Sequence, residues 1–353
     1  MVNRTMYRPA VTALSAYVPG EQPPPGKCIK LNTNENPYPP APAVVEAIRQ
    51  AAEGSLNRYP DPMANAFRRA AAEALDLPGP EWVLAGNGSD EILTLLVRGF
   101  VGEGEKLSMP FPSYVLYRTL ADIQGAQWEQ AEFDDHWQLP NGFGASADQL
   151  KLALLPNPNS PSGTVVTSEE VVNLSSRLSC PLLVDEAYAD FAEENCVELV
   201  MKHENIFVSR TLSKSYGLAG IRFGFLVANP DVIAELAKIK DSYNCDAISI
   251  AAATAAMNCT EWLSANCRKI IATRTRVTPE LEKIGFLVTP SQANFLWCRH
   301  ERVEHREIYD FLKSQQILVR LMDFGDRGDG LRISIGTDEQ MDALLFILNG
   351  YLS

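Results

Sequence analysis

Two short apolar runs flank a single lysine in 205-NIFVSRTLSKSYGLAGIRFGFLVA-228. The runs NIFVSR and RFGFLVA have the length and the apolar content of buried strands. Between them, Lys214 lies among hydroxyl, glycine and apolar residues, and Arg222 follows it. A lysine on the surface needs no such neighbours, whereas a lysine that attacks a carbonyl needs surroundings that favour its uncharged amine. The stretch therefore predicts a strand, a turn with a reactive lysine, and a second strand.

The same pattern extends over the preceding part of the chain. Short apolar runs alternate with segments of helical spacing, which is typical of βαβ units and of a parallel sheet covered on both faces. We therefore expect an α/β fold with a ligand site at the carboxyl ends of its strands, near a switch in strand order. The expected strands are WVLAG (82–86), KLSMP (106–110), LALLP (152–156), PLLVDE (181–186), NIFVSR (205–210) and RFGFLVA (222–228), and the expected helices lie at 42–52 and near 63–76, 90–100, 113–124 and 168–178.

Changes in composition and in the predicted elements divide the 353 residues into three parts. Residues 1–40 are rich in proline and asparagine and predict an extended arm. Residues 41–245 form the expected large domain, and residues 246–353 a smaller α+β domain, which residues of the arm could join. In the smaller domain we expect a long helical stretch over about 246–284 that ends at Gly285, then NFLWCR, a helix near 303–315, ILVRL, LRISIG and a terminal helix.

Composition and charge narrow the class of protein. A hydrophobic fraction of 46% and a net charge of −13 describe a globular chain and argue against nucleic acid as a partner. The seven cysteines are scattered without a CxxC pair, so we expect reduced thiols and, with only four histidines, no metal site. The N-terminal residues do not resemble a signal peptide, and no stretch is long and apolar enough for a membrane span. We expect a cytoplasmic protein that does not bind membranes.

Four motifs lie at the ends of predicted strands or at the starts of predicted helices, and two of them are turns. In 86-GNGSDE-91, glycines let the backbone approach a ligand, and Ser89 and Asp90 open a helix whose free amides could bind a phosphate. By itself this motif fits an ordinary capped turn better. In 157-NPNSPSGT-164, the bond before Pro161 could be cis and bring the Ser160 side chain near a ligand, although a simple two-proline loop would look the same.

The other two motifs carry ionisable side chains. In 184-VDEAY-188, Asp185 ends a buried strand, so its carboxylate needs a partner such as a protonated ring nitrogen, and Tyr188 could donate to a phenolate-like oxygen. A helix cap at a strand exit explains this motif about equally well. The opening stretch adds two hydroxyls and a guanidinium suited to a phosphate, from Thr211, Ser213 and Arg222.

The order and spacing of these motifs resemble the fold-type I pyridoxal-phosphate aminotransferases along almost the whole chain. Within that group the sequence is most similar to the histidinol-phosphate aminotransferases. The resemblance implies a large, doubly wound, mostly parallel sheet domain, a smaller C-terminal α+β domain, and a homodimer with shared active sites. The closer match rests on YVPG (17–20), LNTNENP (31–37), RYPDP (58–62), LVR (318–320) and LRISIGT (331–337).

The resemblance also implies roles for individual residues. Lys214 would link covalently to pyridoxal phosphate and then move the substrate proton as a base. Asp185 would keep the pyridine nitrogen protonated, Tyr188 would hydrogen-bond the ring oxygen, and Tyr114 would stack on the ring. The remaining cofactor contacts, mostly to the phosphate, would come from Gly88, Ser89, Asp90, Thr211, Ser213 and Arg222, with Tyr59 reaching in from the neighbouring subunit.

The substrate would meet a second set of residues. Arg332 and Arg320, aided by Tyr17, would bind both the substrate phosphate and a carboxylate of the returning glutamate. Asn36 would contribute a contact from the arm. Ser160 is the expected cofactor contact in the 157–164 turn, but it departs from the family pattern, because an asparagine that contacts the ring oxygen usually stands at this position. Its hydroxyl can still donate a hydrogen bond, with a shorter reach, and the neighbouring Asn157 or Asn159 could substitute for it.

The implied reaction converts histidinol phosphate and 2-oxoglutarate into imidazole acetol phosphate and glutamate, in histidine biosynthesis. Two alternatives keep the same fold and lysine, namely a threonine-phosphate decarboxylase and an aromatic amino acid aminotransferase. Two others belong to different classes, a ligand-sensing regulator and a scaffold without activity. The regulator would need a DNA-binding extension, and the first 40 residues contain neither a helix-turn-helix pattern nor a basic patch. The scaffold conflicts with the intact set of lysine, aspartate, tyrosine and arginine.

Overall fold

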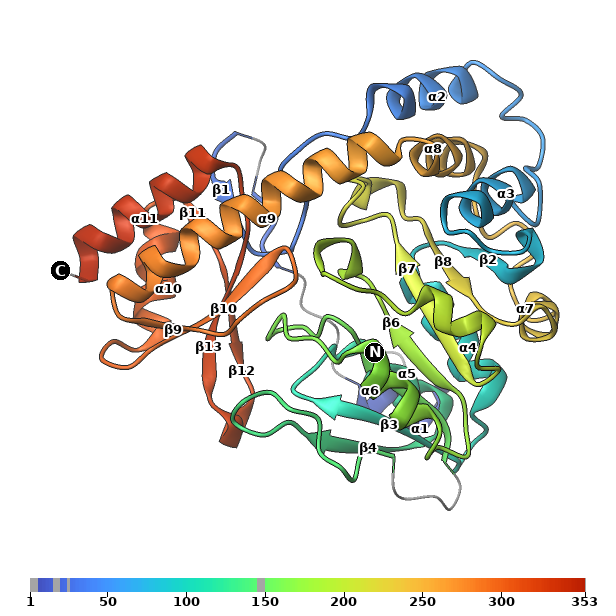
Figure 1. Ribbon diagram of the computed structural model, residues 1–353, viewed down its shortest axis with the longest axis horizontal. Coiled ribbons are helices and arrows are strands. Elements are labelled where there is room, and N and C mark those ends of the chain that lie inside the picture. Colours follow the sequence, from blue (N-terminus) through green and yellow to red (C-terminus); the bar gives the residue numbers. More distant parts are fainter. Residues whose placement is uncertain (1–5, 15–19, 24–25, 145–149, 353) are drawn as a thin grey trace.

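A seven-stranded sheet forms the centre of the larger unit in the computed structural model, which describes residues 6–14, 20–23, 26–144 and 150–352 (Figure 1). In spatial order its strands are β2 (Val83–Gly86), β8 (Gly224–Val227), β7 (Ile206–Thr211), β6 (Leu182–Asp185), β5 (Leu150–Pro156), β3 (Lys106–Phe111) and β4 (Gln127–Glu132). Strands β7, β6, β5, β3 and β4 pair in parallel, and β8 runs antiparallel to both of its neighbours. The predicted α/β class with a mostly parallel sheet is confirmed.

Helices cover both faces of this sheet because alternate strand residues are apolar on both sides. In β6, Leu183 belongs to one core cluster, whereas Leu182 and Val184 belong to the other. The helices on the Leu183 face are α4 (Ser89–Phe100), α5 (Leu116–Gln124) and α7 (Pro230–Ala237). Those on the Val184 face are α3 (Asn65–Ala74), α6 (Ser168–Ser175) and α8 (Ala247–Met257), with α2 (Pro42–Ala52) packed on α8.

The predicted strands and helices of this unit are present, with ends that differ by a few residues. Strand β4 was not predicted, because its sequence QWEQAE lacks an apolar run. It lies at the edge of the sheet and pairs only with β3, so most of its side chains are partly exposed. An edge strand that is half solvated carries little of the hydrophobic pattern that sequence reasoning uses.

The smaller unit is built on an antiparallel sheet with β12 (Arg320–Asp323), β13 (Asp329–Ser334), β10 (Phe295–His300) and β9 (Phe286–Val288) in that order. Its core is shared with α9 (Thr260–Lys283), α10 (His305–Ser314) and α11 (Asp338–Leu352). The N-terminal arm carries the short helix α1 (Pro9–Ala13), and its strand β1 (Ile29–Lys30) pairs in parallel with β11 (Ile317–Leu318). Residues of the arm therefore do join the smaller unit, as the sequence suggested.

The helical stretch expected over 246–284 consists of two helices, α8 and α9. Helix α8 packs in the core of the larger unit, to which it contributes Ile250, Ala253 and Met257. Helix α9 contributes to the core of the smaller unit and runs across to it from the end of α8 (Figure 1). We therefore propose that the division between the units falls at the α8–α9 connection rather than at residue 246.

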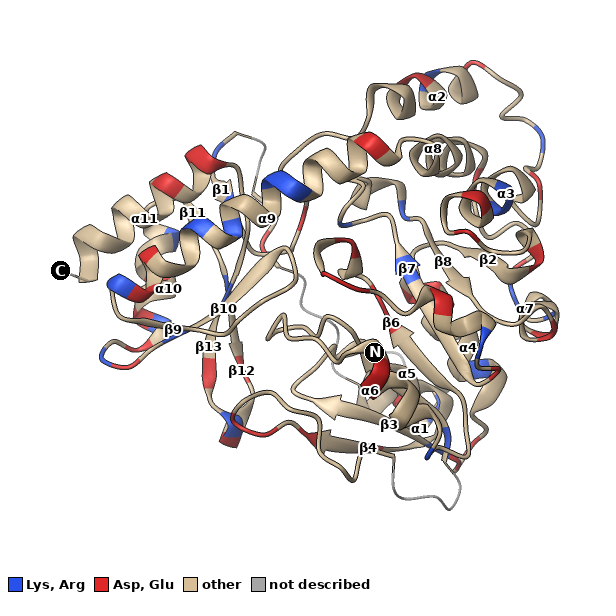
Figure 2. Cartoon of the chain, viewed as in Figure 1, with Lys and Arg blue, Asp and Glu red and all other residues tan. Residues whose placement is uncertain are grey.

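Figure 2 shows both acidic and basic positions along α9 and α10, whereas the charged positions of α11 are all acidic. The net charge of the chain is −13, which disfavours an anionic polymer as a partner. Within the described part of the chain, no helix combines the length and the apolar character needed to cross a membrane.

Candidate active site

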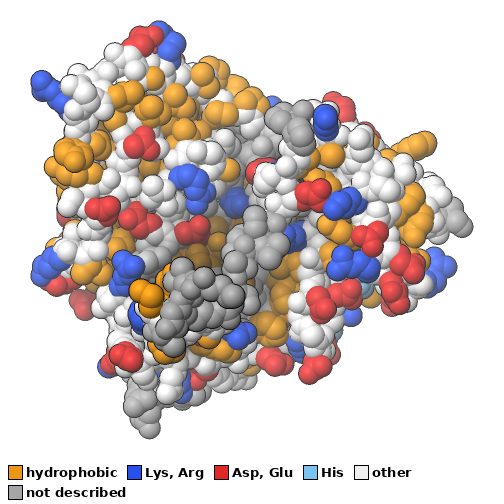
Figure 3. Space-filling model, turned by 180° about the vertical axis from the view of Figure 1, so that it is seen from behind, with side chains coloured by type: hydrophobic (Ala, Val, Ile, Leu, Met, Phe, Trp, Pro, Cys, Tyr) orange, Lys and Arg blue, Asp and Glu red, His pale blue; other side chains and the backbone are white. Residues whose placement is uncertain are grey.

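The carboxyl ends of four strands meet at one edge of the large sheet. Strands β5, β6 and β7 are parallel, and β2 has the same direction because both β2 and β7 are antiparallel to β8. A cavity of about 240 Å³ opens at this edge. From behind, the surface is hollowed between the two units, with basic side chains around the hollow (Figure 3). Twelve predicted residues line the cavity: Ser89, Asp90, Tyr114, Ser160, Asp185, Tyr188, Thr211, Ser213, Lys214, Arg222, Arg320 and Arg332.

Asp185 and Tyr117 line the buried end of the cavity, and Ser209 contacts Asp185 there. Asp185 and Ser209 are paired across β6 and β7, so their side chains lie on the same face of the sheet as α5. Tyr117 Oη donates a hydrogen bond to Asp185 Oδ2 at 2.7 Å, and Ser209 Oγ donates to Oδ1 at 2.9 Å. Burial raises the pKa of the Asp185 carboxyl, and the two hydroxyl donors partly offset this effect. The protein thus holds a carboxylate in place at a site away from water.

Lys214 and Tyr188 lie in the middle of the cavity. Lys214 Nζ donates to the carbonyl oxygen of Thr33 at 3.2 Å and lies 5.7 Å from the centre of the Tyr188 ring. The Tyr188 ring packs edge-on against Phe295 of β10, with ring centres 5.0 Å apart. Asn34 Nδ2 donates to Tyr188 Oη at 2.9 Å. Residues of the arm therefore contact both side chains.

The open end of the cavity consists of Ser89, Asp90 and Arg222. The Arg222 and Asp90 side chains are about half exposed, and Arg222 Nη2 lies 3.4 Å from Asp90 Oδ2. Helix α4 begins at Ser89 without a side-chain cap, so its first backbone amides can bind an anion. Glycine is needed at two positions here: a Cβ on Gly224 would lie 2.4 Å from Ser89 N, and one on Gly88, where φ is +79°, would lie 2.9 Å from Arg222 Nη2.

Tyr114 connects the two ends. Its hydroxyl donates to Asp90 Oδ1 at 3.2 Å, and its ring packs edge-on against Tyr117 with ring centres 5.6 Å apart. Burial raises the pKa of Tyr114, and the negative charge of Asp90 raises it further. The tyrosine therefore stays neutral near physiological pH and offers an aromatic face to the cavity.

Arginines of the smaller unit form another wall of the cavity. Arg332 Nη1 donates to Ser160 Oγ at 2.9 Å, and Arg332 Nη2 donates to the carbonyl oxygen of Asn32 at 3.4 Å. Arg320 is paired with Arg332 across β12 and β13, so both side chains project from the same face of the sheet. The peptide bond between Ser160 and Pro161 is cis. Two guanidinium groups thus lie on the same wall of one cavity.

Three of the predicted residues that the structure describes do not line this cavity. Gly88 lies just outside it as the residue before α4. Tyr59 is 78% exposed and stacks on Tyr243 with ring centres 4.2 Å apart. Asn36 does not reach the cavity, because its Nδ2 donates to the carbonyl oxygen of Ser215 at 2.8 Å and its Oδ1 accepts from the backbone of Tyr38. Tyr17 lies outside the described residues.

Sequence reasoning missed Tyr117, Ser209 and Asn34. Tyr117 lies three residues after Tyr114 in FPSYVLY, and Ser209 lies opposite Asp185 in the sheet, so helical spacing and strand register could have identified both. Asn34 stands within LNTNENP, but its contact spans more than 150 residues of sequence. No local pattern predicts such a contact.

A buried ion-pair cluster supports the turn that carries Lys214. Arg210 of β7 lies 2.7 Å from a carboxylate oxygen of Glu186 and 2.7 Å from one of Asp190. Ser215, the residue after Lys214, donates a hydrogen bond to Asp190. A conformation of the turn that separated these side chains would leave a buried charge without its partner. The cluster therefore strongly favours the observed conformation of the turn. It was not predicted from the sequence.

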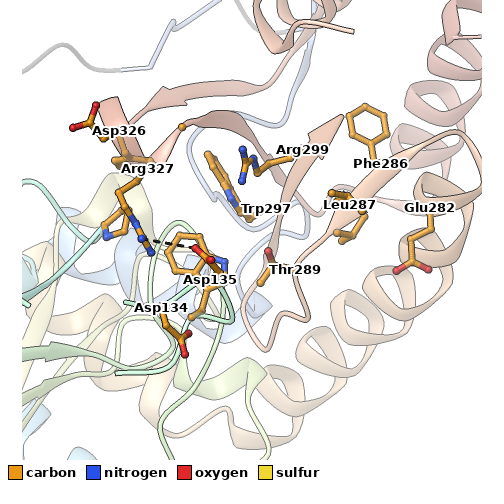
Figure 4. A pocket seen from close by; sticks show the side chains of 15 residues that line it. Asp134, Asp135, Glu282, Phe286, Leu287, Thr289, Trp297, Arg299, Asp326 and Arg327 are labelled. Carbon is orange, nitrogen blue, oxygen red and sulfur yellow. Dashed lines mark ion pairs between the residues drawn. The ribbon is translucent and has the colours of Figure 1, made fainter. Parts of the chain in front are cut away.

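A second and larger cavity, of about 730 Å³, lies against the sheet of the smaller unit (Figure 4). Arg327 points across it towards Asp135, 3.9 Å away, and donates to the carbonyl oxygen of Phe133. Its lining contains no lysine and no buried carboxylate, so we assign the chemistry to the smaller cavity. It is lined by Pro112, Asp134, Asp135, Trp137, Glu282, Phe286, Leu287, Val288, Thr289, Trp297, Arg299, Phe324, Asp326, Arg327 and Gly328. Among the described residues, no cluster of His, Cys, Asp or Glu could hold a metal ion.

Comparison with known proteins identifies the class. Residues 26–348 match the family of class I and II aminotransferases, and the chain belongs to this family. It is 70% identical over 342 residues to the histidinol-phosphate aminotransferase of Rhodopirellula baltica, covering 97% of this chain and 94% of the relative. It is 44% identical to histidinol-phosphate aminotransferase 1 of Nostoc sp., covering 98% of both.

A solved structure of a protein with the same fold supports this assignment. The histidinol-phosphate aminotransferase of Sinorhizobium meliloti, in complex with pyridoxal-5'-phosphate, superposes with a TM-score of 0.88 at 26% identity. The superposition covers 99% of this chain and 98% of that one. The predicted membership of the aminotransferase family is confirmed.

Proposed function

We propose that this chain is a pyridoxal-phosphate-dependent aminotransferase that converts L-histidinol phosphate and 2-oxoglutarate into imidazole acetol phosphate and L-glutamate, a step of histidine biosynthesis. The observation that carries this proposal is a single cavity with a lysine, a buried carboxylate and an anion-binding helix start. The 70% identical relative, a histidinol-phosphate aminotransferase, supports the choice of substrate. No observation favours the decarboxylase or the aromatic aminotransferase.

The residues present fit pyridoxal phosphate at both ends of the cavity. At the buried end, no ion pair among the described residues involves Asp185, so a protonated ring nitrogen would supply the missing positive charge. At the open end, Gly88 and Gly224 leave room for the helix start, where Arg222 and the α4 amides would bind the phosphate. Thr211 and Ser213, whose hydroxyls lie 3.0 Å apart, would add two donors.

Pyridoxal phosphate, when bound, supplies an aldehyde that combines with amines and a ring that accepts electrons. The residues of the chain then bind, orient and move protons. Lys214 Nζ would carry the proton from the α-carbon of the substrate to the aldehyde-derived carbon of the cofactor, because it is the only lysine that lines the described cavity. Asp185 would hold the ring nitrogen proton, Tyr188 would donate to the ring oxygen, and Tyr114 would cover the ring face.

Arg332 and Arg320 give the cavity a site for anionic groups. Guanidinium groups suit both the phosphate of histidinol phosphate and the carboxylates of glutamate, so one site can accept the two substrates in turn. Ser160 accepts a hydrogen bond from Arg332 at 2.9 Å, and we propose that it holds this guanidinium rather than taking the usual role of asparagine at the ring oxygen. Asn36 would act indirectly, since it contacts the backbone beside Lys214.

We propose that the working enzyme is a homodimer in the cytoplasm. Tyr59 lies at the surface, outside the cavity of its own chain, which supports a role in the site of a neighbouring subunit. Tyr59 stacks on the exposed Tyr243, and Figure 3 shows apolar side chains gathered over the region of α2 and α3, where Val45 and Leu56 are also exposed. All seven cysteines are unpaired, as in a reducing compartment.

A panel of amine donors tests the substrate. The purified chain, loaded with pyridoxal phosphate and given 2-oxoglutarate, is assayed for glutamate with histidinol phosphate, phenylalanine or threonine phosphate. We expect kcat/KM for histidinol phosphate to exceed that for phenylalanine by at least about a hundredfold, since two guanidinium groups bind a phosphate that phenylalanine lacks. Equal rates with phenylalanine, or release of carbon dioxide from threonine phosphate, would contradict the proposed substrate.

A further inference from the structure

Three consecutive residues of the arm each contact a different side chain of the active-site cavity. The carbonyl oxygen of Asn32 accepts from Arg332 and that of Thr33 accepts from Lys214, whereas the amide of Asn34 donates to Tyr188. Asn32 and Asn34 are both buried. This turn is therefore part of the site, although it lies about 180 residues before Lys214 in the sequence.

The hydrogen bonds around Asn34 fix the orientation of its amide. The backbone N–H of Asn34 donates to Ser334 Oγ at 2.8 Å, so the hydroxyl hydrogen of Ser334 remains available. That hydrogen is donated to Asn34 Oδ1, 3.0 Å away. The amide oxygen is thereby assigned to Ser334, and the amide nitrogen must face Tyr188 Oη. Asn294 holds the same turn by donating to the carbonyl oxygen of Asn34 at 3.0 Å.

The backbone of Asn34 lies in the left-handed region, with φ of +54°. Among residues other than glycine, asparagine tolerates this conformation best, because its short polar side chain can hydrogen-bond locally. Glycine adopts the same conformation without strain. The substitution Asn34→Gly therefore removes the amide with little effect on the backbone.

We propose that Asn34 is a positioning residue that fixes Tyr188 as a hydrogen-bond donor towards the cavity. A tyrosine hydroxyl carries one hydrogen, and because its oxygen accepts from Asn34, that hydrogen is directed to another partner. The inference rests on the proposed function, in which the partner is the ring oxygen of pyridoxal phosphate. The charged groups that line the same cavity are Glu35, Asp90, Asp185, Lys214, Arg222, Arg320 and Arg332.

This chain of hydrogen bonds joins three parts of the molecule. Ser334 belongs to β13 of the smaller unit, Asn34 to the arm, and Tyr188 to the larger unit just after β6. The hydroxyl of Tyr188 is consequently oriented only when the arm and the smaller unit are in place. The structure thus links the position of the arm to the hydrogen bond that Tyr188 offers.

A pH titration of visible absorbance tests the proposal without substrate and without turnover. The enzyme is loaded with pyridoxal phosphate, and the midpoint of its absorbance change is measured for the wild type, Asn34→Gly and Asn34→Asp. A donor to the ring oxygen stabilises the deprotonated form of the lysine-linked cofactor, so weakening this donor raises the midpoint. We expect a rise of about 0.5 units for Asn34→Gly and about 1 unit for Asn34→Asp, whose carboxylate would accept the tyrosine hydrogen itself.

The same titration in a Tyr188→Phe background separates orientation from charge. We expect the effect of Asn34→Asp to fall below about 0.3 units there, because no hydroxyl remains to be oriented. An equal shift in both backgrounds would mean that the carboxylate acts through its charge alone and would overturn the proposal. Asn229→Asp makes the same change at the N-cap of α7, far from the cavity, and should leave the midpoint unchanged.

Two further outcomes are decisive. If Asn34→Asp does not fold, the titration of Asn34→Gly tests the proposal by itself. An unchanged midpoint of the absorbance change in Asn34→Gly would overturn the role of Asn34. A wild-type protein that binds no pyridoxal phosphate, and so gives no visible absorbance, overturns the proposed function together with the inference that depends on it.

Discussion

The two ends of the active-site cavity are built in opposite ways. At the buried end, Asp185 is shielded from water and both of its oxygens accept hydroxyl hydrogens from Tyr117 and Ser209. At the open end, Arg222 and Asp90 are about half exposed and form a long contact of 3.4 Å. The buried charge is satisfied by fixed donors, whereas the exposed charges are satisfied largely by water.

This difference follows from the cost of removing charge from water. A buried carboxylate without donors would be strongly penalised, so the fold must supply the donors before any ligand arrives. A half-exposed ion pair such as that of Arg222 with Asp90 contributes little stability, because the surrounding water weakens the attraction. Arg222 can therefore exchange its contact with Asp90 for a contact with a phosphate at small cost. We therefore expect the buried end to set the reactivity of the cofactor and the open end to set its affinity.

The largest effect is expected for Lys214→Ala, which removes the group between the two ends. Loss of both the covalent link and the general base should lower kcat by at least about 10⁴-fold. In the wild type, borohydride reduction followed by peptide mass spectrometry should place pyridoxal phosphate on Lys214. A modified peptide elsewhere, or a variant that retains visible absorbance and turnover, would contradict the assignment.

The next effect is expected for Asp185→Asn at the buried end. The amide keeps the shape of the carboxylate but cannot hold the ring nitrogen proton, so kcat should fall by roughly 10²- to 10³-fold. Steady-state kinetics at saturating pyridoxal phosphate measure this loss. Glu186→Gln is not a suitable control because Glu186 pairs with Arg210, but Glu198→Gln on the exposed surface is. A decrease in cofactor affinity without a decrease in kcat would show that Asp185 acts in binding. It would contradict the proposed difference in role between the two ends of the cavity.

Arg222→Ala tests the open end. Losing charge-assisted hydrogen bonds to the phosphate should weaken pyridoxal phosphate binding by roughly ten- to a hundredfold, with kcat largely restored at saturating cofactor. Arg222→Lys keeps the charge and should lose less. Equilibrium dialysis measures the affinity, and high salt should weaken it more in the wild type than in the alanine variant. A large loss of kcat at saturation would contradict the division of roles.

Tyr117→Phe removes one of the two donors at Asp185. We expect a fall in kcat of about tenfold, because one hydroxyl donor to a buried carboxylate is worth about 1.5 kcal/mol. The ¹⁵N chemical shift of the ring nitrogen in labelled cofactor should also move towards the neutral value. Tyr309→Phe, at a partly buried tyrosine packed against the core of the smaller unit, is the control. An unchanged ¹⁵N chemical shift would show that the hydrogen bond from Ser209 alone is enough for Asp185 to keep the ring nitrogen protonated.

The smallest effect concerns the stability of the protein without cofactor. Burial raises the pKa of Asp185 in the folded state, so the folded protein binds more protons than the unfolded chain above about pH 4, and stability falls as pH rises through this window. Asp185→Asn removes that penalty and should raise Tm by a few degrees at pH 7, with the difference shrinking towards pH 4. A lower Tm at pH 7 would contradict the sign.

Much of the sheet could be predicted because its central strands are buried on both faces. The runs PLLVDE and NIFVSR became β6 and β7, and the last residues of these strands, Asp185 and Thr211, line the cavity because parallel strands end at one edge. Strand β4 could not be predicted, since an edge strand with polar residues lacks the pattern. The helical stretch predicted over about 246–284 consists of two helices, and the sequence did not predict the break at Asn258 because it leaves little trace in the periodicity.

The candidate site was predictable where its residues follow strands, and less so where contacts span the chain. Lys214, Asp185 and Arg222 belong to local motifs next to strand ends. Asn34 meets Tyr188 only because β1 joins the smaller unit and brings the arm to the cavity. Such contacts depend on tertiary structure and carry no local signature. The roles of Tyr59 and Asn36 remain predictions, since neither side chain lines the described cavity.

The most direct test of the central claim is a single-turnover half-reaction. The enzyme is loaded with pyridoxal phosphate, mixed with histidinol phosphate without 2-oxoglutarate, and followed by absorbance. We expect rapid conversion of the cofactor to its amine form with histidinol phosphate, and at least about a hundredfold slower conversion with phenylalanine. Cofactor that stays in its aldehyde form with histidinol phosphate, or that returns to it with release of carbon dioxide from threonine phosphate, would contradict the proposed function.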